Sequence, residues 1–353
     1  PDPYFDGKGP DRTGCIHCGE CMTGCRRNAK NTLDKNYLYL AQQLGAEILA
    51  EHEVTDVKPI DNLDGSDGYS IYFKSGKTKK TIQTKGVIFA GGVMGTIPLL
   101  LKIKEKSLPN LSERLGCQVS TNNEALINIT SKNSQQDFTK GIAIGSILHT
   151  DENSHLEPTR YGHGSGFFKL LMLPMAYGSN VFVRFFKMIW KIVKAPISFL
   201  KILFDKNFAS KTTILLFMQT VNSTIRIKKG YITPMKTVVE SGNKPSAFIP
   251  EAKDLAERYS KIVDGKAMVS FAETVFGIPT TAHILGGAVM GKNKAEGVIN
   301  LNNEVFGYQN MLICDGSMIS ANPGVNPSLS ITAITERAMS NIAEKTDNTL
   351  ETT

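Results

Sequence analysis

Apolar residues recur at helical spacing in several stretches of the chain, and this spacing predicts helices there. Leu33, Tyr37 and Leu40 share one helical face, with Thr32 placed to cap the helix and Gly45 placed to end it. The same spacing predicts further helices at residues 99–103, 181–194, 252–263 and 331–342.

Strand patterns fill much of the first ninety residues, at 48–57, 69–73, 78–84 and 87–90. The middle two flank Ser75-Gly76-Lys77 and predict a hairpin. The last is a continuous apolar run, typical of a strand covered on both faces, and it ends at Gly91-Gly92. Because a helix follows, with Pro98 expected in its first turn, this part predicts half of a doubly wound α/β unit.

The segment from Met311 onward predicts a buried strand, a turn and a capped helix. The strand, 311–314, ends at Asp315-Gly316-Ser317, and after a Gly/Pro-rich loop Asn326 and Pro327 occupy the N-cap and first helical positions. The free N–H groups of such a helix start, including that of Ser328, favour a negative ligand or an electron-rich ring.

The order of these patterns predicts an α/β fold with two domains. Residues 1–121 and 279–345 form a doubly wound domain, and residues 122–278, where the periodicity becomes longer and less regular, form a second domain with α+β elements. Within the second domain, 214–219 and 224–227 have strand patterns. The polar tail, 346–353, is expected to be disordered.

Composition narrows the class of protein only slightly. The chain has 353 residues, is 41% hydrophobic and 21% charged, and carries a formal charge of +7, as expected for a globular protein with weak attraction for anionic surfaces. No nucleic-acid recognition motif is present, so we expect no nucleic-acid partner. The given sequence begins at Pro1 and shows neither a Met nor a basic-apolar leader, so we expect it to be a fragment. No uncharged apolar run reaches the length of a membrane span.

Four of the six cysteines lie close together near the start of the chain. Cys15, Cys18, Cys21 and Cys25 have the spacing of a bacterial ferredoxin cluster motif, so an iron–sulfur cluster is one interpretation, with a zinc site and a structural thiol cluster as the others. Arg26 replaces the usual proline and no second motif occurs, which favours the thiol cluster. Cys117 and Cys314 stand in apolar surroundings and are expected in the core.

Residues 167–204 predict basic amphipathic helices. Between Val181 and Lys194 the cations recur at steps of three and four residues, with the aromatic and aliphatic side chains largely opposite, and no acidic residue occurs from Pro158 through Phe204. Such a helix favours the surface of a membrane. An ordinary covering helix and a mobile lid over a substrate cavity are the alternatives.

Several motifs, in their order along the chain, are together more specific than any one of them. They are Cys15-Ile-His-Cys-Gly-Glu-Cys, Gly86-Val-Ile-Phe-Ala-Gly-Gly, Thr281-Ala-His283-Ile-Leu-Gly-Gly, Asp315-Gly-Ser and Gly324-Val-Asn326-Pro327. This series resembles the glucose-methanol-choline (GMC) flavin oxidoreductases, and most closely their cholesterol-oxidase-like branch. The resemblance covers nearly the whole chain, with the middle matching least well.

The resemblance implies a role for each of these positions. His283 matches the residue that hydrogen-bonds the substrate hydroxyl, and Asn326 the one beside the reduced flavin. FAD contacts are implied for a further set: Val54, Gly91, Gly92, Asp315, Gly316, Asn326, Pro327 and Ser328. Taken singly, His283 also suits a core histidine, Asp315-Gly316 an ordinary turn and Val54 a core valine.

The resemblance implies an FAD-dependent enzyme that oxidises the CH–OH group of a bulky apolar alcohol, possibly a sterol, with dioxygen or a carrier as electron acceptor. The family's GxGxxG fingerprint lies upstream of these residues, so the doubly wound FAD-binding domain is expected to be incomplete at its amino terminus, beside a mixed-sheet substrate domain. Strand 211–218 has no acidic residue where sterol enzymes carry a carboxylate. The rivals are an iron–sulfur flavin dehydrogenase and an inactive or membrane-associating fragment. The expected location is cytoplasmic, with peripheral contact at the inner membrane face.

Overall fold

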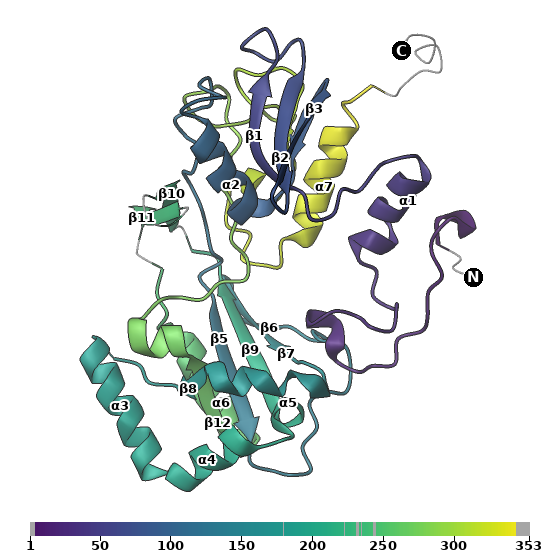
Figure 1. Ribbon diagram of the computed structural model, residues 1–353. Coiled ribbons are helices and arrows are strands. Elements are labelled where there is room, and N and C mark those ends of the chain that lie inside the picture. The colour runs from purple at the N-terminus through teal and green to yellow at the C-terminus, as the bar shows by residue number, and fades with distance from the viewer. Residues whose placement is uncertain are drawn as a thin grey trace. The chain divides into compact units, whose positions relative to one another are not determined.

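The chain divides into two compact units, each assembled from segments that are distant in sequence (Figure 1). The computed structural model describes residues 4–178, 180–221, 223–230, 233, 235–242 and 245–343. Unit 1 comprises Pro1–Leu49, Asn123–Gln219 and Ser246–Thr281, and unit 2 comprises Ala50–Asn122, Thr220–Pro245 and Ala282–Thr353. The predicted tail, 346–353, lies outside the described residues.

This division follows the predicted domain bounds closely near residues 122 and 279 and differs elsewhere. Residues 1–49 pack with the middle of the chain, whereas 220–245 pack with the outer segments. Helices and strands are both present, so the fold is mixed α/β. The amphipathic helices predicted over 167–204 are confirmed only at 181–194 and 196–204, because residues 172–174 form a strand that pairs with residues 268–270.

Unit 1 is built on a six-stranded antiparallel sheet in the order β6-β7-β9-β5-β12-β8. The strands are β5 (Ala125–Ser131), β6 (Leu148–Asp151), β7 (Ser154–Thr159), β8 (Met172–Pro174), β9 (Thr212–Gln219) and β12 (Gly265–Ser270). Its helices are α1 (Tyr37–Gln43), α3 (Val181–Lys194), α4 (Pro196–Phe204), α5 (Phe208–Lys211) and α6 (Pro250–Ile262).

One face of this sheet is covered by α6. Pro250 stands at the first helical position, and Ala252 and Ala256 are almost fully buried, so the small side chains let the helix approach the strands closely. Ile127 and Phe217 meet it from the sheet and complete an apolar core.

Unit 2 combines an antiparallel three-stranded sheet with a parallel strand pair. Its strands are β1 (Glu53–Pro59), β2 (Tyr69–Ser75), β3 (Thr78–Thr84), β4 (Val87–Phe89), β10 (Thr224–Lys229), β11 (Met235–Ser241) and β13 (Met311–Ile313), and its helices are α2 (Gly92–Ile103) and α7 (Ser328–Met339). Strand β4 pairs in parallel with β13, more than 200 residues later, and leads through Gly91 into α2. A single core built around α2 holds these elements together.

Two helix predictions were wrong in their starting points. Helix α2 begins at Gly92, which places Pro98 in its interior rather than in its first turn. A proline inside a helix costs about 3 kcal/mol. Burial of Ile97 and Leu100, neither of which is exposed, offsets this at about 1.5–3 kcal/mol each. The first predicted helix is divided in two: Thr32 is the N-cap of a 3₁₀ turn, Leu33–Lys35, and the α-helix begins at Tyr37, where the Asn36 side chain accepts a hydrogen bond from the Tyr37 N–H.

Two further boundaries differ from prediction. The strand expected over 48–57 is β1, which begins at Glu53. Helix α7 begins at Ser328, so Pro327 is its N-cap, and Asn326, the predicted N-cap, lies one residue before it. The first bond of that helix, from the Ile331 N–H to the Pro327 carbonyl, spans 2.9 Å.

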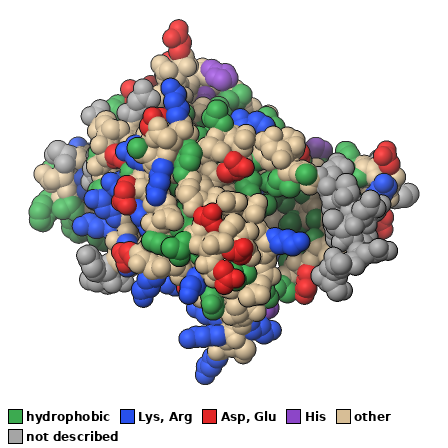
Figure 2. Space-filling view, turned by 90° about the horizontal axis from the view of Figure 1, so that it is seen from above, with side chains coloured by type: hydrophobic (Ala, Val, Ile, Leu, Met, Phe, Trp, Pro, Cys, Tyr) green, Lys and Arg blue, Asp and Glu red, His purple; other side chains and the backbone are tan. Residues whose placement is uncertain are grey.

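Charge is distributed rather than gathered into one field on the face drawn in Figure 2. There, Lys and Arg side chains are interspersed with Asp and Glu. Among the residues that the structure describes, no helix has both the length and the apolar character needed to cross a membrane.

Candidate active site

The carboxylate of Asp315 joins two turns of unit 2 that are far apart in sequence. Its Oδ2 accepts hydrogen bonds from the Gly92 N–H at 2.9 Å and from the Thr96 hydroxyl at 2.5 Å. Its Oδ1 accepts from the Ser317 N–H at 2.8 Å and from the Ser317 hydroxyl. Asp315 is only 5% exposed. It therefore fixes the glycine turn after β4 against the turn after β13.

Glycine is required at two positions in this arrangement. Gly92 has φ +69°, a left-handed conformation that disfavours other residues, and no atom lies within 4 Å of where its Cβ would be. Gly286 has φ +84°, and a Cβ there would lie 2.2 Å from the Gln118 carbonyl oxygen. The first glycine leaves open space beside a backbone N–H, and the second allows two backbone segments to touch.

The segment that carries His283 packs directly against the Asp315 turn. The Gly286 N–H donates to the Gly316 carbonyl and the Ala288 N–H to the Ser317 carbonyl, both at 2.9 Å. Gly286 is three residues from His283 along the chain, so these bonds tie the segment that carries the histidine to the predicted cofactor turn.

Residues 120–122 anchor both predicted catalytic segments. Ser120 and Leu285 exchange backbone hydrogen bonds of 2.9 and 3.0 Å as an antiparallel bridge. Because the two segments run in opposite directions, the chain from Ser120 to Asn122 and the chain from Leu285 back to His283 leave the bridge at the same end. The Asn122 amide donates to the Val325 carbonyl at 3.0 Å, next to Asn326. The backbone just after His283 and the backbone just before Asn326 are thus held by one short segment, residues 120–122, while the meeting of the two side chains stays a prediction.

Val54 and Gly91 line one cavity in unit 2, together with Gly95 and Thr96. The cavity has a volume of about 370 Å³ and follows β4 and the start of α2. Val54 is 39% exposed and lies where the pairing of β1 with β2 shifts register. Apolar walls beside an open glycine turn suit the nucleoside part of a dinucleotide, so the predicted cofactor residues fit such a group.

The start of α7 places Asn326, Pro327 and Ser328 in consecutive positions. Pro327 makes no side-chain cap, and the hydroxyl of Thr332 donates to the Ser328 carbonyl at 2.9 Å inside the helix. The first N–H groups of α7 are therefore not satisfied by a cap from Pro327.

The cysteine run gives no support to an iron–sulfur cluster. Across the described part of the chain, which includes all four cysteines, no group of three or more His, Cys, Asp or Glu side chains is placed to hold a metal ion. The thiols instead have local partners. Cys25 Sγ accepts from the Ala29 N–H at 3.4 Å, and this bond lowers the Cys25 pKa below its ordinary value. Cys117 and Cys314 lie in the core, as predicted, and burial raises the pKa of Cys314 to about 11.

The sequence reasoning missed the buried ionisable side chains of unit 1. Strand β9 indeed lacks an acidic residue, but Glu157 on the neighbouring strand β7 is paired in register with Leu216 and is buried. Its Oε1 lies 3.6 Å from His155 Nε2, and burial lowers the His155 pKa. The signal available in the sequence was the spacing of His155 and Glu157, which are two residues apart and therefore share one face of the strand.

A second buried carboxyl, Glu273, lies in a short π-helical turn. Desolvation raises its pKa to about 7, against hydrogen bonds from Thr280 that lower it. π-Helical turns occur often at functional sites.

The glycine turns, the parallel strand pair and the Asp315 tie are typical of the strand–turn–helix units of α/β proteins that bind nucleotides. The GMC oxidoreductase family pattern matches residues 9–115 and again residues 230–335. The chain belongs to the GMC oxidoreductase family.

Its relatives point to one part of that family. The chain is 42% identical to a cholesterol oxidase of Acinetobacter baumannii, over 99% of the chain and 65% of that protein, and 38% identical to a cholesterol oxidase of Mycobacterium tuberculosis, over 96% and 61%. The chain thus spans under two thirds of the length of these relatives. The pyridoxine 4-oxidase from Mesorbium loti has a similar fold, with a TM-score of 0.55 at 12% identity over 89% of this chain and 63% of that one.

Proposed function

We propose that this chain is part of an FAD-dependent oxidoreductase that oxidises the CH–OH group of a bulky apolar alcohol. The observation that supports this most directly is the Asp315 tie. It brings the Gly91-Gly92 turn, the Asp315-Gly316 turn and the His283 segment into one strip of unit 2.

In this proposal each predicted residue has a defined task. Val54 and Gly91 line the cavity for the nucleoside part of FAD, and Asp315 keeps both glycine turns in position. Bound FAD would supply the acceptor for the hydride of the alcohol carbon. The His283 imidazole holds the substrate hydroxyl and accepts its proton. The Asn326 side-chain amide would lie beside the flavin ring, which is electron-rich when reduced.

A sterol is the proposed substrate and dioxygen the proposed acceptor. The support is the name of the two relatives near 40% identity, both cholesterol oxidases. A long-chain-alcohol oxidase of Arabidopsis thaliana, FAO3, matches at 23% over 89% of the chain, so long aliphatic alcohols belong in the same substrate panel.

We further propose that the FAD-binding domain is completed by residues outside this chain. Strand β4 pairs only with β13 in the described structure, which leaves its second edge able to accept another parallel strand. The greater length of the relatives is consistent with this.

The test uses the full-length protein and its His283→Gln variant. We expect yellow flavin absorbance in both, and anaerobic bleaching of that absorbance by cholesterol about 10²–10⁴-fold slower in the variant, the usual contribution of a positioned proton acceptor. His149→Gln, which changes an exposed histidine on β6, is the matched control and should reduce at the parent rate. Absence of flavin, or equal rates in parent and His283→Gln, would contradict the proposal.

A further inference from the structure

Helices α3 and α4 present a continuous run of large apolar side chains to solvent. We call this the α3–α4 surface, and its nine members are 39–75% exposed: Phe182, Phe185, Phe186, Ile189, Trp190, Val193, Ile197, Leu200 and Phe204. Single exposed apolar residues are ordinary, but a contiguous apolar patch marks an interaction site. Helix α4 has no buried residue at all.

Three of the cations of α3, Arg184, Lys187 and Lys191, donate hydrogen bonds to backbone carbonyls of unit 1 and hold the helix in this orientation. Arg184 is 7% exposed, and its Nε donates to the Thr274 carbonyl at 3.0 Å while its guanidinium stacks on Phe248. Lys187 Nζ donates to the Tyr177 carbonyl at 3.0 Å and Lys191 Nζ to the Met175 carbonyl at 2.7 Å. An amphipathic helix on a globular protein normally buries its apolar side. Here the hydrogen bonds of the polar side keep the apolar side outward.

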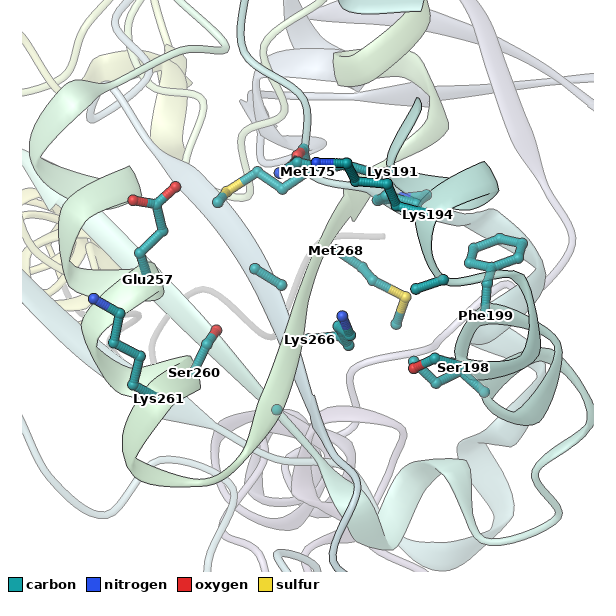
Figure 3. Close-up of a pocket in the computed structure, with 15 residues that line it drawn as sticks. Met175, Lys191, Lys194, Ser198, Phe199, Glu257, Ser260, Lys261, Lys266 and Met268 are labelled. Atoms are coloured by element: carbon teal, nitrogen blue, oxygen red, sulfur yellow. Dashed lines mark hydrogen bonds between the residues drawn. The ribbon is translucent and has the colours of Figure 1, made fainter. Parts of the chain in front are cut away.

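A cavity of about 410 Å³ lies behind these helices, against β12 and α6 (Figure 3). Figure 3 shows Met268 and Phe199 on one side of it and Glu257, Ser260 and Lys261 on α6 on the other. Four of the residues that line it are lysines, Lys191, Lys194, Lys261 and Lys266, and one, Glu257, is acidic. The lining is therefore both apolar and positively charged.

A second cavity, of about 670 Å³, adjoins α4 and shares Lys194, Ala195, Ser198 and Ile202 with the first. It adds Lys132, Lys201 and Lys211, against Asp205 alone. Asp205 already forms an ion pair of 2.7 Å with Lys211, and Lys132 is ion-paired with Asp264. The lysines around α4 thus exceed the carboxylates.

The electrostatics of Lys191 indicate that an anion would be stabilised here. Burial is the main cause that lowers the Lys191 pKa, and repulsion from Lys253, Lys266 and Lys187 adds to it against attraction from Glu257. A negative group in the cavity would relieve that repulsion.

We propose that the α3–α4 surface docks on an anionic lipid bilayer, with its apolar side chains in the interface and a lipid phosphate held by the lysines around α4. The apolar surface and the lysines supply the two signals that stable peripheral attachment needs. A second copy of the chain is a poorer occupant, because a symmetric contact would bring the exposed Lys194 and Lys201 of both copies together.

Trp190 gives a direct measurement, since it is the sole tryptophan of these 353 residues and is 59% exposed on this surface. A Trp190→Phe variant of the full-length protein assigns the emission change to this residue. Full-length protein is mixed with vesicles of phosphatidylcholine alone and of phosphatidylcholine with phosphatidylglycerol. We expect a blue shift of tryptophan emission, and quenching by brominated acyl chains, that require the anionic lipid. Sedimentation should show at least tenfold tighter binding to the anionic vesicles. Equal binding to both vesicles, or no emission change, overturns the proposal.

Variants separate the two parts of the surface. Phe182→Ser with Phe186→Ser should abolish the shift, whereas Leu63→Ser with Leu301→Ser, exposed apolar residues of unit 2, should leave it unchanged. Lys194→Met with Lys266→Met should weaken vesicle binding roughly 5-fold per lysine, and Lys77→Met with Lys79→Met, on the β2–β3 hairpin, should not. Circular dichroism checks that each variant is folded.

Further arms identify the source of the anion and the occupant. Inorganic phosphate alone should neither shift the emission nor release the protein from vesicles at constant ionic strength. If it does either, the lysines bind free phosphate and the lipid assignment is wrong. A shift that grows with protein concentration without lipid assigns the surface to a second copy and likewise overturns the proposal. None of these readouts needs flavin or substrate, so they stand or fall apart from the proposed oxidation.

Discussion

Replacement of Asp315 by asparagine should loosen the strand pair that carries the cofactor turns. The carboxylate accepts four hydrogen bonds and is 5% exposed. An asparagine keeps one acceptor oxygen but turns an NH₂ group toward donors, either toward Gly92 and Thr96 or toward Ser317. A hydrogen bond to a charged group contributes about 1.5–3 kcal/mol. Loss of two, with some relaxation, should cost about 2–4 kcal/mol.

Hydrogen exchange measures this locally, which suits a chain of two units whose global unfolding need not be two-state. Amides of β4 and β13 should exchange roughly 30- to 1,000-fold faster in Asp315→Asn, since each 1.4 kcal/mol is a factor of about ten. Asp61→Asn, at an exposed loop position, is the control and should stay within about 0.5 kcal/mol of the parent. Thr96→Val removes two hydrogen bonds, the one that the Thr96 hydroxyl donates to Asp315 and the one that it accepts from the Gly91 N–H at 3.1 Å, but it leaves the other three bonds of Asp315 in place and should show an intermediate effect. If the β4 amides exchange at the parent rate in Asp315→Asn, the Asp315 hydrogen bonds do not hold β4 in place and the prediction is wrong.

Three other changes test separate features. Gly286→Ala would place a Cβ 2.2 Å from the Gln118 carbonyl oxygen at φ +84°. It should lower the stability of unit 2 by more than about 2 kcal/mol, measured by urea titration. An unchanged stability would mean that the backbone at Gly286 is not fixed. Glu273, whose folded pKa of about 7 exceeds its unfolded value, contributes stability that is full below about pH 4.5 and lost by about pH 7. Glu273→Gln should remove about 3 kcal/mol of that pH dependence. An unchanged slope of the unfolding free energy against pH would count against a neutral buried carboxyl. Replacement of Cys15, Cys18, Cys21 and Cys25 by serine should leave the iron content and the visible spectrum as in the parent. Loss of bound iron would restore the iron–sulfur cluster hypothesis.

Local patterns predicted those elements whose signals lie within the element itself. Helix α3 has the predicted bounds because Asn180 caps it, accepting from the Val183 N–H at 2.9 Å, and its two faces differ sharply in polarity. The β2–β3 hairpin likewise follows from its alternation and its Gly76 turn. The start of α2 could not be predicted in this way, because it depends on burial of Ile97 in a core shared with distant segments.

The same limit applies to the site. The glycine turns and Asp315 were predicted from linked motifs, but the direction of the Asp315 bonds depends on the pairing of β4 with β13. Glu157 was missed because its neighbour in the sheet is β9, not a strand adjacent in sequence. Periodicity gives α3 two faces without saying which one turns inward; the carbonyls of Tyr177 and Met175 decide that.

The hydrogen bond between Gly92 and Asp315 can form only late in synthesis. Its partners are 223 positions apart, so at roughly 5–20 residues per second the ribosome needs about 10–45 s to deliver the second after the first. During that interval the nascent β4 has no β13 to pair with, and its apolar residues are open to chaperones or to wrong partners. Slowing translation between the two codons should therefore increase chaperone dependence of the yield, although the finished protein is the same.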